Sequence, residues 1–218
     1  MPGKLAALLI VDDEPAIRSS ISQALTEIGY RVRSAEDGLA ALREIQTEVP
    51  DLLLSDLNMP GMSGFELLSV VRRRFPAIRT IAMSGAFSGN EVPSGVAADR
   101  FYQKGSSIVA LLRIMETLPQ LERPAHQPTS PDAPLWIHRN TRDLSTDASV
   151  TVTCPECLRT FPQTLGDGGS ERKTGCIYCR SSIHSVAAQP AERMPPQPVQ
   201  PKAPAAIPFQ RSASNSRY

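Results

Sequence analysis

The sequence has few aromatic residues, almost no net charge and no long hydrophobic run. Aromatic residues make up 5% of its 218 residues, and the formal net charge is +1. No apolar run approaches the roughly 18 residues of a membrane-spanning helix, and the chain does not start with the basic, apolar and small-residue order of a signal peptide. We therefore expect a cytoplasmic protein without a membrane partner, and its net charge gives no reason to favour nucleic acid.

Cysteine is scarce and confined to one part of the chain. All four cysteines lie between Cys154 and Cys179, in two close pairs. In a reducing compartment, cysteines at such close spacing indicate a bound metal rather than disulfides. The remaining composition, 41% hydrophobic and 21% charged residues, fits one full domain plus a smaller module.

Residues 1–120 alternate short apolar strands with segments of helical periodicity. Ile17, Ile21 and Leu25 recur at helical spacing, and Gly29 then ends that helix. Strands that alternate with helices form βαβ units, in which helices cover both faces of a parallel sheet. The predicted fold class is therefore α/β, with a five-stranded doubly wound parallel sheet. Its expected strands are Leu5–Val11, Arg31–Ala35, Leu52–Ser55, Ile78–Ser84 and Arg100–Gln103.

The rest of the chain divides by composition. Before the fifth strand, glycine and proline leave room only for a short helix that starts near Pro93. Residues 121–134 are rich in proline and predict an extended linker. Residues 135–186 contain all the cysteines and form a second module. Residues 187–218 hold seven prolines and few apolar side chains, so we expect a disordered tail.

Polar residues stand at the ends of four of the predicted strands. Asp12 and Asp13 follow the first strand, Asp56 follows the third, and Ser84 and Lys104 close the last two. In an open parallel sheet these ends meet along one edge, where ligands bind. Three close carboxylates repel one another unless a cation lies among them, and Mg²⁺ prefers oxygen ligands. Since a carboxylate can also accept a phosphoryl group, this edge is predicted to be a phosphoryl-accepting site.

Four motifs mark this edge of the sheet. They are Val11-Asp12-Asp13-Glu14, Ser55-Asp56 through Met59-Pro60 to Ser63-Gly64, Ala82-Met83-Ser84, and Phe101-Tyr102-Gln103-Lys104. Taken together, over roughly residues 5–120, they resemble the receiver domain of two-component response regulators, whose fold is flavodoxin-like.

The resemblance implies how phosphate and metal would bind. Asp56 would be the phosphoacceptor, and its donor would be a histidine kinase, a phosphotransfer protein or a small phosphodonor. Asp13 and Asp56 would bind Mg²⁺ directly together with the backbone carbonyl of Asn58, and Asp12 would bind it through water. Such a domain assists only its own phosphorylation and dephosphorylation, so it would not be an enzyme that acts on another substrate.

The resemblance also implies roles for residues of the last two strands. Ser84 would bond the phosphoryl group in the activated state, and Lys104 would pair with it. Phe101 would be the aromatic residue whose rotation reports that movement, and Tyr102 should point to the other face of the sheet. Two features depart from the family. Gly105 stands where the family has a proline after a cis bond, and the short fourth helix belongs to the family's output face, so ordinary receiver dimerisation is not predicted.

The cysteines form two C-x-x-C pairs, Cys154-Pro155-Glu156-Cys157 and Cys176-Ile177-Tyr178-Cys179, with eighteen residues between them. This spacing is typical of a tetrahedral zinc site. With strands expected over 150–153 and 158–161, the segment resembles a zinc ribbon. His184 is a further candidate ligand, although four cysteines already fill the shell. A closed four-thiolate shell has no open position for catalysis, so a structural or protein-binding role is predicted.

Four functional hypotheses follow. The leading one is a phosphorelay response regulator whose zinc ribbon binds a protein partner. The alternative is a transcriptional regulator whose ribbon binds nucleic acid, but six basic against five acidic residues over 135–186 leave little positive charge for that role. A phosphohydrolase with Asp56 or Asp12 as nucleophile would have its two acids as D-x-D, whereas Asp12 and Asp13 are adjacent. A scaffold that no longer turns over phosphate would not need so complete a site.

Overall fold

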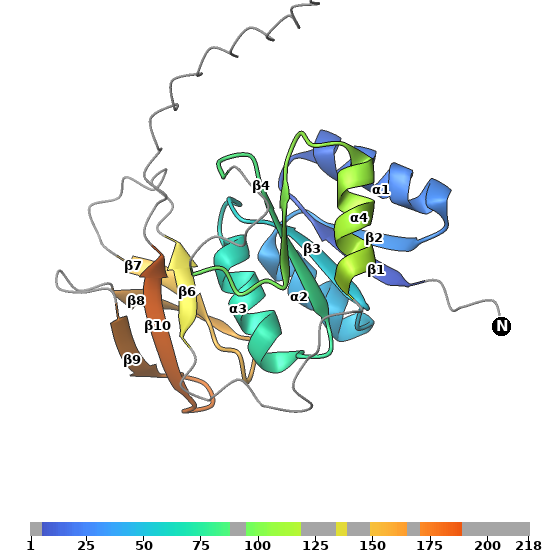
Figure 1. The fold of residues 1–218 in the computed structure, drawn as a ribbon. Helices are drawn as coiled ribbons and strands as arrows, with labels where there is room; N and C mark the ends of the chain where they lie inside the picture. The colour runs from blue at the N-terminus through green and yellow to red at the C-terminus, as the bar shows by residue number, and fades with distance from the viewer. Residues whose placement is uncertain (1–5, 88–94, 119–133, 139–148, 165–170, 189–218) are drawn as a thin grey trace, which may run out of the picture.

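A five-stranded parallel sheet forms the centre of the protein. The structure, a computed structural model, describes residues 6–87, 95–118, 134–138, 149–164 and 171–188 (Figure 1). The strands are β1 (Ala7–Val11), β2 (Arg31–Ala35), β3 (Leu52–Asp56), β4 (Arg79–Ser84) and β5 (Arg100–Gln103), in the order β2-β1-β3-β4-β5. The predicted five-stranded doubly wound sheet is confirmed, with small shifts at the ends of β1, β3 and β4.

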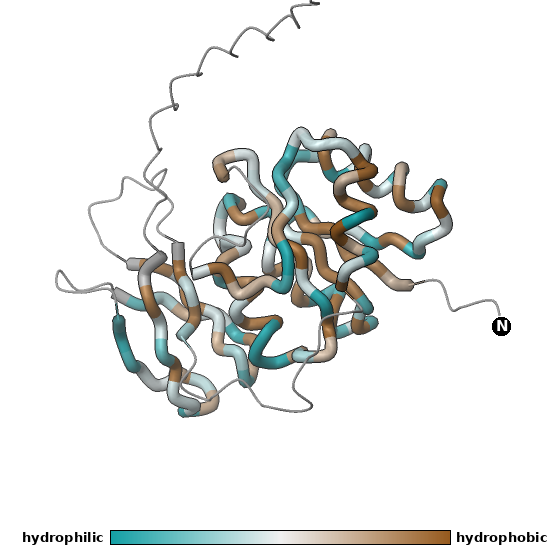
Figure 2. The backbone as a smooth tube through the Cα atoms, viewed as in Figure 1, coloured by the Kyte–Doolittle hydropathy of each residue, from teal (hydrophilic) through white to brown (hydrophobic). Residues whose placement is uncertain are grey.

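Helices cover both faces of this sheet. α1 (Pro15–Ile28) and α4 (Ile108–Thr117) lie on one face, and α2 (Gly38–Thr47) and α3 (Gly64–Arg74) lie on the other. Successive residues of β1 alternate between the two cores, because Leu8 and Ile10 pack toward α1 and α4 whereas Leu9 and Val11 pack toward α2 and α3. Burial on both faces explains the continuous apolar run of this strand, whose hydrophobic colour stands out in Figure 2.

The connection between β4 and β5 lacks a helix where the structure describes it. The predicted short helix near Pro93 falls on residues 88–94, which lie outside the described residues, and residues 95–99 lead into β5 without helix. None of the helices in the described segments is long and apolar enough to cross a membrane.

The start of α3 lies directly against the end of β3. A methyl group added at Gly64 would come within 1.8 Å of the backbone oxygen of Asp56. Ser63 caps the helix, because its hydroxyl accepts a hydrogen bond from the backbone N–H of Glu66. A glycine is therefore required at the first position of α3, and this close approach ties the helix to the strand that carries Asp56.

The cysteine-containing segment forms two small sheets. Strands β6 (Leu135–His138), β9 (Glu171–Gly175) and β10 (Ser182–Ala188) pair in the order β6-β10-β9, and β7 (Ser149–Thr153) and β8 (Thr160–Thr164) form an antiparallel pair. We call these five strands, with the turns described between them, the C-terminal module. It differs from the predicted ribbon in two places: the strand expected over 158–161 begins at Thr160, because Leu158 closes a turn with φ of 57°, and β10 runs past residue 186.

The C-terminal module packs on α3 and shares its core (Figure 1). Apolar residues of β6, β7, β8 and β10 belong to the same buried cluster as those of α2 and α3, namely Leu135, Ile137, Val152, Phe161 and Ile183. Two backbone N–H groups of the module also bond to side chains of α3: that of Trp136 donates to the Ser69 hydroxyl (3.2 Å), and that of Thr153 donates to the Glu66 carboxylate (2.6 Å). Every residue of α3 from Gly64 to Val71 is buried as a result.

Glu66 is a carboxylic acid enclosed between α3 and the module. Only 3% of its surface is exposed. Burial raises the pKa of Glu66 to about 7, although the hydrogen bonds from Thr153 partly oppose this shift. At neutral pH this interface therefore holds a partly protonated acid, which is costly to ionise and which can be exchanged for an uncharged acceptor without losing the bond from Thr153.

Replacing Gly64 by alanine should destabilise the domain. The added methyl group meets the backbone of Asp56 and Leu57, which cannot move aside as a side chain could, so we expect a loss of about 1–3 kcal/mol in the free energy of unfolding. Urea unfolding followed by circular dichroism measures this loss. Gly85→Ala is the matched control, because its nearest neighbour would be Lys104 Cβ at 3.9 Å, an ordinary contact. Equal stability of the two variants would contradict the close approach at Gly64.

Glu66→Gln should remove a pH dependence of stability. The folded-state pKa of about 7 lies above the ordinary value of 4.5, so the folded state holds this proton more tightly, and stability falls as pH rises from about 4.5 through 7. The wild type should lose at most about 3 kcal/mol over this range relative to Glu66→Gln. Parallel denaturation curves at several pH values test this difference, with the exposed Glu116→Gln as control. A difference in the free energy of unfolding between wild type and Glu66→Gln that stays the same at every pH would rule out the raised pKa.

Candidate functional site

The structure brings the predicted acids and lysine together at the carboxyl edge of the large sheet. The Lys104 ammonium lies 2.9 Å from Asp12 Oδ2 and 2.8 Å from Asp56 Oδ2, so it bridges the two carboxylates. The carboxylate of Asp13 belongs to the same group, since oxygens of the three acids lie within 4.8 Å of one another. Asp12 and Asp56 are buried, whereas Asp13 is exposed. The end of β3, the residue that follows β5 and the turn after β1 thus form one site.

Local hydrogen bonds hold the acidic turn after β1 in place. The Asp12 carboxylate accepts a hydrogen bond from the backbone N–H of Glu14 (2.9 Å), just before α1 begins at Pro15. The guanidinium of Arg18, one turn into α1, donates to the backbone carbonyl of Asp12 (2.6 Å). The turn therefore places two adjacent acids differently, with Asp12 directed into the site and Asp13 at its solvent side.

The charges at this site do not balance within the protein. Burial raises the pKa of Asp56, and the neighbouring Lys104 opposes this rise. Burial lowers the pKa of Lys104, but the hydrogen bonds of its ammonium to Asp56 and Asp12 have the larger combined effect. The pKa of Lys104 is therefore raised above its ordinary value. Three carboxylates face one ammonium, all donors are oxygens, and a divalent cation would restore neutrality. The residues present therefore fit Mg²⁺.

Ser84 and Asn58 stand beside the carboxylates. The Ser84 hydroxyl is buried, accepts a hydrogen bond from the backbone N–H of Ala86 (3.1 Å), and lies 3.4 Å from the side-chain amide of Asn58. The backbone of Asn58 also hydrogen-bonds Asp56, which favours its ionised form. Asn58 therefore contacts Asp56 through its backbone and Ser84 through its side chain.

The aromatic pair on β5 points to opposite faces, as predicted. Phe101 is 1% exposed, belongs to the α2–α3 core and makes an edge-to-face contact with Phe87, with ring centroids 6.3 Å apart. Tyr102 belongs to the α1–α4 core and donates a hydrogen bond from its hydroxyl to the carbonyl of Ser106 (2.6 Å). Phe101 is therefore turned inward.

The backbone after Lys104 differs from the cis bond of the family. Gly105 has a φ of 86°, and the described residues contain no cis peptide bond.

Two residues of the site were not recognised from the sequence. Arg18 fixes the backbone of Asp12 from the second turn of α1, and Gly64 allows α3 to approach Asp56. A glycine at the first position of a helix signals a close backbone approach in retrospect. Arg18 has no comparable signal, because an arginine on an amphipathic helix is ordinarily a solvated residue.

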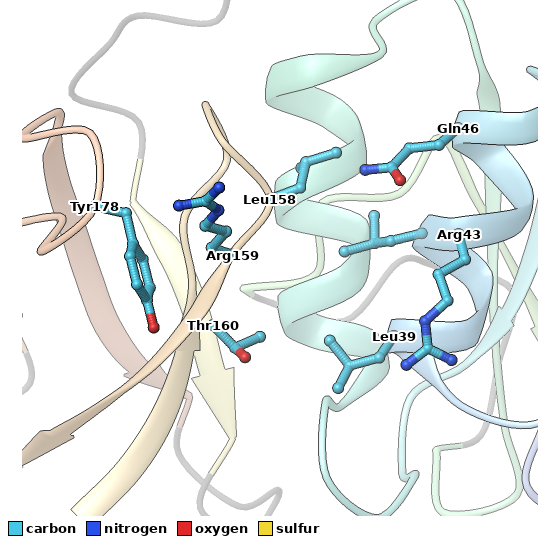
Figure 3. Close-up of a pocket in the computed structure, with 8 residues that line it drawn as sticks. Leu39, Arg43, Gln46, Leu158, Arg159, Thr160 and Tyr178 are labelled. Atoms are coloured by element: carbon cyan, nitrogen blue, oxygen red, sulfur yellow. The ribbon is translucent and has the colours of Figure 1, made fainter.

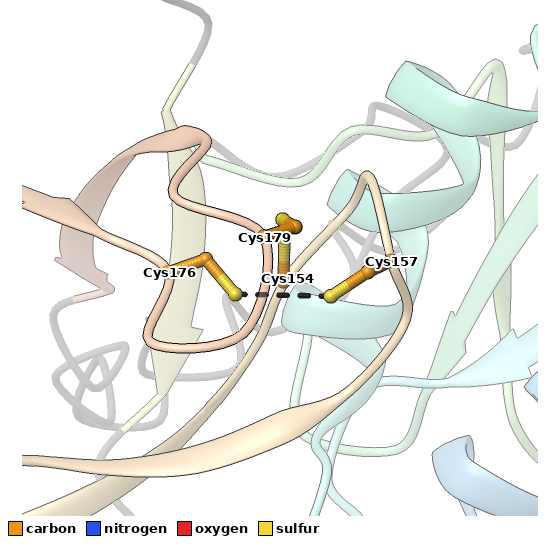
Figure 4. Close-up of side chains that lie close together, drawn as sticks. All are labelled: Cys154, Cys157, Cys176 and Cys179. Atoms are coloured by element: carbon orange, nitrogen blue, oxygen red, sulfur yellow. Dashed lines mark hydrogen bonds between the residues drawn. The ribbon is translucent and has the colours of Figure 1, made fainter.

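The four cysteines form a second site, in the C-terminal module (Figure 4). Cys154 Sγ lies 3.6 Å from Cys179 Sγ, and Cys157 Sγ lies 3.7 Å from Cys176 Sγ. A disulfide needs about 2.05 Å, whereas a regular tetrahedron of Zn–S bonds near 2.3 Å places its sulfurs roughly 3.8 Å apart. The four thiols thus have the separation of a zinc shell, and each pair comes from one turn.

The two cysteine turns have the same backbone geometry. In the first turn the N–H of Cys154 donates to the carbonyl of Arg159, and in the second the N–H of Cys176 donates to that of Ser181, both at 2.9 Å. In each pair, the residue that follows the second cysteine adopts a left-handed backbone conformation, with φ of 57° at Leu158 and 61° at Arg180. Two non-glycine residues in this conformation indicate that each turn is held by its surroundings.

The four thiols differ in their pKa values, and His184 does not belong to the cysteine cluster. Burial raises the pKa of Cys154 to about 12, whereas the contacts to Ser181 lower the pKa of the exposed Cys179 to about 6. Cys154 would have to lose its proton to ligate a metal, whereas the lowered pKa of Cys179 favours its thiolate form. His184 is buried and pairs with Glu171 (2.5 Å). This further candidate ligand therefore lies outside the cysteine cluster.

Comparison with known proteins matches the first part of the chain. Residues 8–109 match the family model of the response regulator receiver domain. The DNA-binding transcriptional regulator NtrC of Klebsiella pneumoniae is 37% identical over 97 residues, which are 44% of this chain and 19% of NtrC. The sensor protein EvgS of Escherichia coli K12 is 35% identical over 97 residues, 44% of this chain and 8% of EvgS. The chain thus covers only a small part of each relative.

Solved structures cover the same part. The chemotaxis response regulator CheY4 of Vibrio cholerae is 29% identical, with a TM-score of 0.48 over 53% of this chain and 99% of CheY4. The response regulator TrrA of Thermotoga maritima, solved with Mg²⁺ and BeF, is 31% identical, with a TM-score of 0.49 over 52% of this chain and 99% of TrrA. The match to the family model identifies residues 8–109 of this chain as a response regulator receiver domain, and the C-terminal module lies outside that match.

Proposed function

We propose that this protein is a phosphorelay response regulator that accepts a phosphoryl group on Asp56 with Mg²⁺ and passes the signal to a zinc-bound C-terminal module. The observation that carries the proposal is the Lys104 ammonium, which lies within 3 Å of both Asp12 and Asp56 at the carboxyl edge of the sheet. Its donor would be a histidine kinase or a phosphotransfer protein in the cytoplasm. The domain would assist only its own phosphorylation and dephosphorylation.

The residues of the site suit transfer to a carboxylate. A carboxylate oxygen of Asp56 attacks the phosphorus, the bond from phosphorus to the donor's histidine nitrogen breaks, and the electron pair leaves with that nitrogen. Lys104 stays protonated because its pKa is raised, so it can neutralise the arriving phosphoryl oxygens. The Ser84 hydroxyl, already fixed by the N–H of Ala86, has its own proton available to donate to the phosphoryl group.

The carboxylates of Asp12, Asp13 and Asp56, with the backbone carbonyl of Asn58, would hold Mg²⁺. When bound, the ion supplies neutralisation of the negative charge that gathers on the transferring group. The protein's own residues keep these oxygens close together before any ligand arrives, because Lys104 offsets part of their repulsion.

The signal has a short physical route to the C-terminal module. Asp56 ends β3, and its backbone oxygen lies against Gly64, the first residue of α3. Two residues further, in the same helical turn, the Glu66 carboxylate accepts a hydrogen bond from the backbone N–H of Thr153. Thr153 immediately precedes the ligand candidate Cys154, and its hydroxyl lies 3.8 Å from Met62 Sδ in the loop after Asp56. A shift of this loop on phosphorylation would therefore act on the module directly.

Zinc would be held by Cys154, Cys157, Cys176 and Cys179, and it would join the two cysteine turns of the module. So small a set of strands gains much of its folding free energy from such an ion. A shell of four thiolates has no open position, so the module would bind a partner, most simply a protein, rather than catalyse a reaction.

Phosphorylation of Asp56 can be tested by intact mass. Incubation with Mg²⁺ and a small phosphodonor such as acetyl phosphate should add one phosphoryl group to the wild type and none to Asp56→Asn. Asp51→Asn is the matched control, because Asp51 precedes the same strand at the opposite edge and bonds the backbone N–H of Ala7. A labile mass increase that persists in Asp56→Asn, or none in the wild type, would contradict the proposed acceptor.

Zinc binding can be tested by elemental analysis of the purified chain. We expect one zinc per chain, lost or strongly reduced in Cys154→Ser because three thiolates bind the ion far less tightly. His184→Gln should retain its zinc, because His184 pairs with Glu171 and lies outside the cysteine cluster. Zinc loss in His184→Gln with full retention in Cys154→Ser would overturn this assignment.

A further inference from the structure

A cleft lies between α2 and the first cysteine turn, where the receiver domain and the C-terminal module meet (Figure 3). Its volume is about 480 Å³, and it is lined by Leu39, Leu42, Arg43, Gln46, Leu158, Arg159, Thr160 and Tyr178. Four of these residues come from α2 and four from the module. The cleft therefore exists only while the module is packed against the receiver domain.

The cleft is positively charged. Arg43 stands on the α2 side and Arg159 on the module side, and none of the lining residues is acidic. Within the described part of the chain, neither guanidinium forms an ion pair, whereas Arg33 and Arg72 each pair with a carboxylate at 2.8 Å. Arg159 instead lies over the Tyr178 ring, 5.2 Å from its centroid. The cleft thus presents two cations with unused hydrogen-bond donors.

Apolar surface accompanies this charge. The half-buried Leu39 and Leu158 contribute accessible aliphatic side chains to the lining, whereas Leu42 is only 3% exposed. Tyr178 of the lining is 49% exposed, and Ile177, which precedes it in the second cysteine turn, is 66% exposed. Exposed tyrosine, isoleucine and arginine around an apolar centre is the composition of a protein-binding surface.

We propose that this cleft binds an extended acidic segment of a partner protein. Carboxylates of that segment bind Arg43 and Arg159, and an apolar side chain between them packs on the leucines. The inference rests on the proposed function, since it names the chemistry of the partner of the C-terminal module. The chain's own residues 189–218 do not suit this cleft, because they hold four basic residues and one acidic residue. Single-stranded nucleic acid suits it less well, because successive bases need several aromatic rings for stacking and the lining offers one, that of Tyr178.

The cleft also connects recognition with the receiver domain. Arg43 and the two α2 leucines belong to the receiver domain, whereas Leu158 and Arg159 follow the zinc-ligand candidate Cys157. A ligand that contacts both sides is bound most tightly when the two sides are held at this separation. Binding of the acidic segment and packing of the module therefore favour each other.

The test measures binding of a defined probe to the full zinc-loaded chain. A short fluorescein-labelled peptide of alternating glutamate and leucine is titrated with protein, and its fluorescence anisotropy is recorded. The wild type should bind it, and the double variant Arg43→Glu with Arg159→Glu should bind about tenfold more weakly or worse. Arg113→Glu is the matched control, because Arg113 is an exposed arginine on α4 away from the cleft, and it should leave binding unchanged.

Two further probes separate the alternatives. A lysine–leucine peptide of equal length and a labelled oligothymidylate should both bind more weakly than the acidic peptide. The proposal is overturned if the acidic peptide does not bind at about millimolar protein, if the cleft variant and Arg113→Glu bind it equally, or if the oligothymidylate binds more tightly. Asp56→Asn should still bind the acidic peptide, so failure of the phosphoacceptor and failure of the cleft give different results.

Discussion

Helix α3 is enclosed on both sides, and the rest of the structure depends on this enclosure. Its inner side packs on the large sheet, and its outer side packs on β6 and β7, so that it is buried from Gly64 to Val71. A helix at a domain surface would expose its polar residues, but Ser69 and Glu66 here accept hydrogen bonds from the module. The receiver domain and the C-terminal module are consequently one packed unit, even though proline-rich sequence separates them along the chain.

This packing places the C-terminal module close to the acidic edge of the large sheet. The described part of the connection between β4 and β5 shows no helix over residues 95–99, and Gly95 there lies against the ring of Trp136. The module thus approaches the domain from α3 and from this connection. Only the loop after Asp56 and the first turn of α3 separate the carboxyl edge of the large sheet from the module. This connection is much shorter than one through a flexible linker.

The sequence predicts the large sheet and the acidic edge well, because both depend on local patterns. Apolar strands such as Leu8–Val11 can be read directly, and parallel strands must bring their carboxyl ends to one edge. The cysteine spacing likewise predicts two turns that face each other. The module's position on α3 could not be predicted, because it depends on contacts between distant residues, such as Glu66 with Thr153. The nearly uniform hydrophobicity of α3, in Phe65, Leu67, Leu68, Val70 and Val71, is the one local sign that both of its sides are covered.

The topology of the C-terminal module sets an order for its assembly. Strand β10 is the middle strand of its sheet, paired with β6 on one side and β9 on the other, and it comes last of the three in the chain. During synthesis the receiver domain has all five strands and α4 before β6 is made, whereas β6 and β9, among the strands that the structure describes, pair only with β10. The part of the outer side of α3 that packs on β6 therefore lacks a complete sheet over it until β10 is made, and its apolar residues are more open to chaperones or to neighbouring chains in that interval.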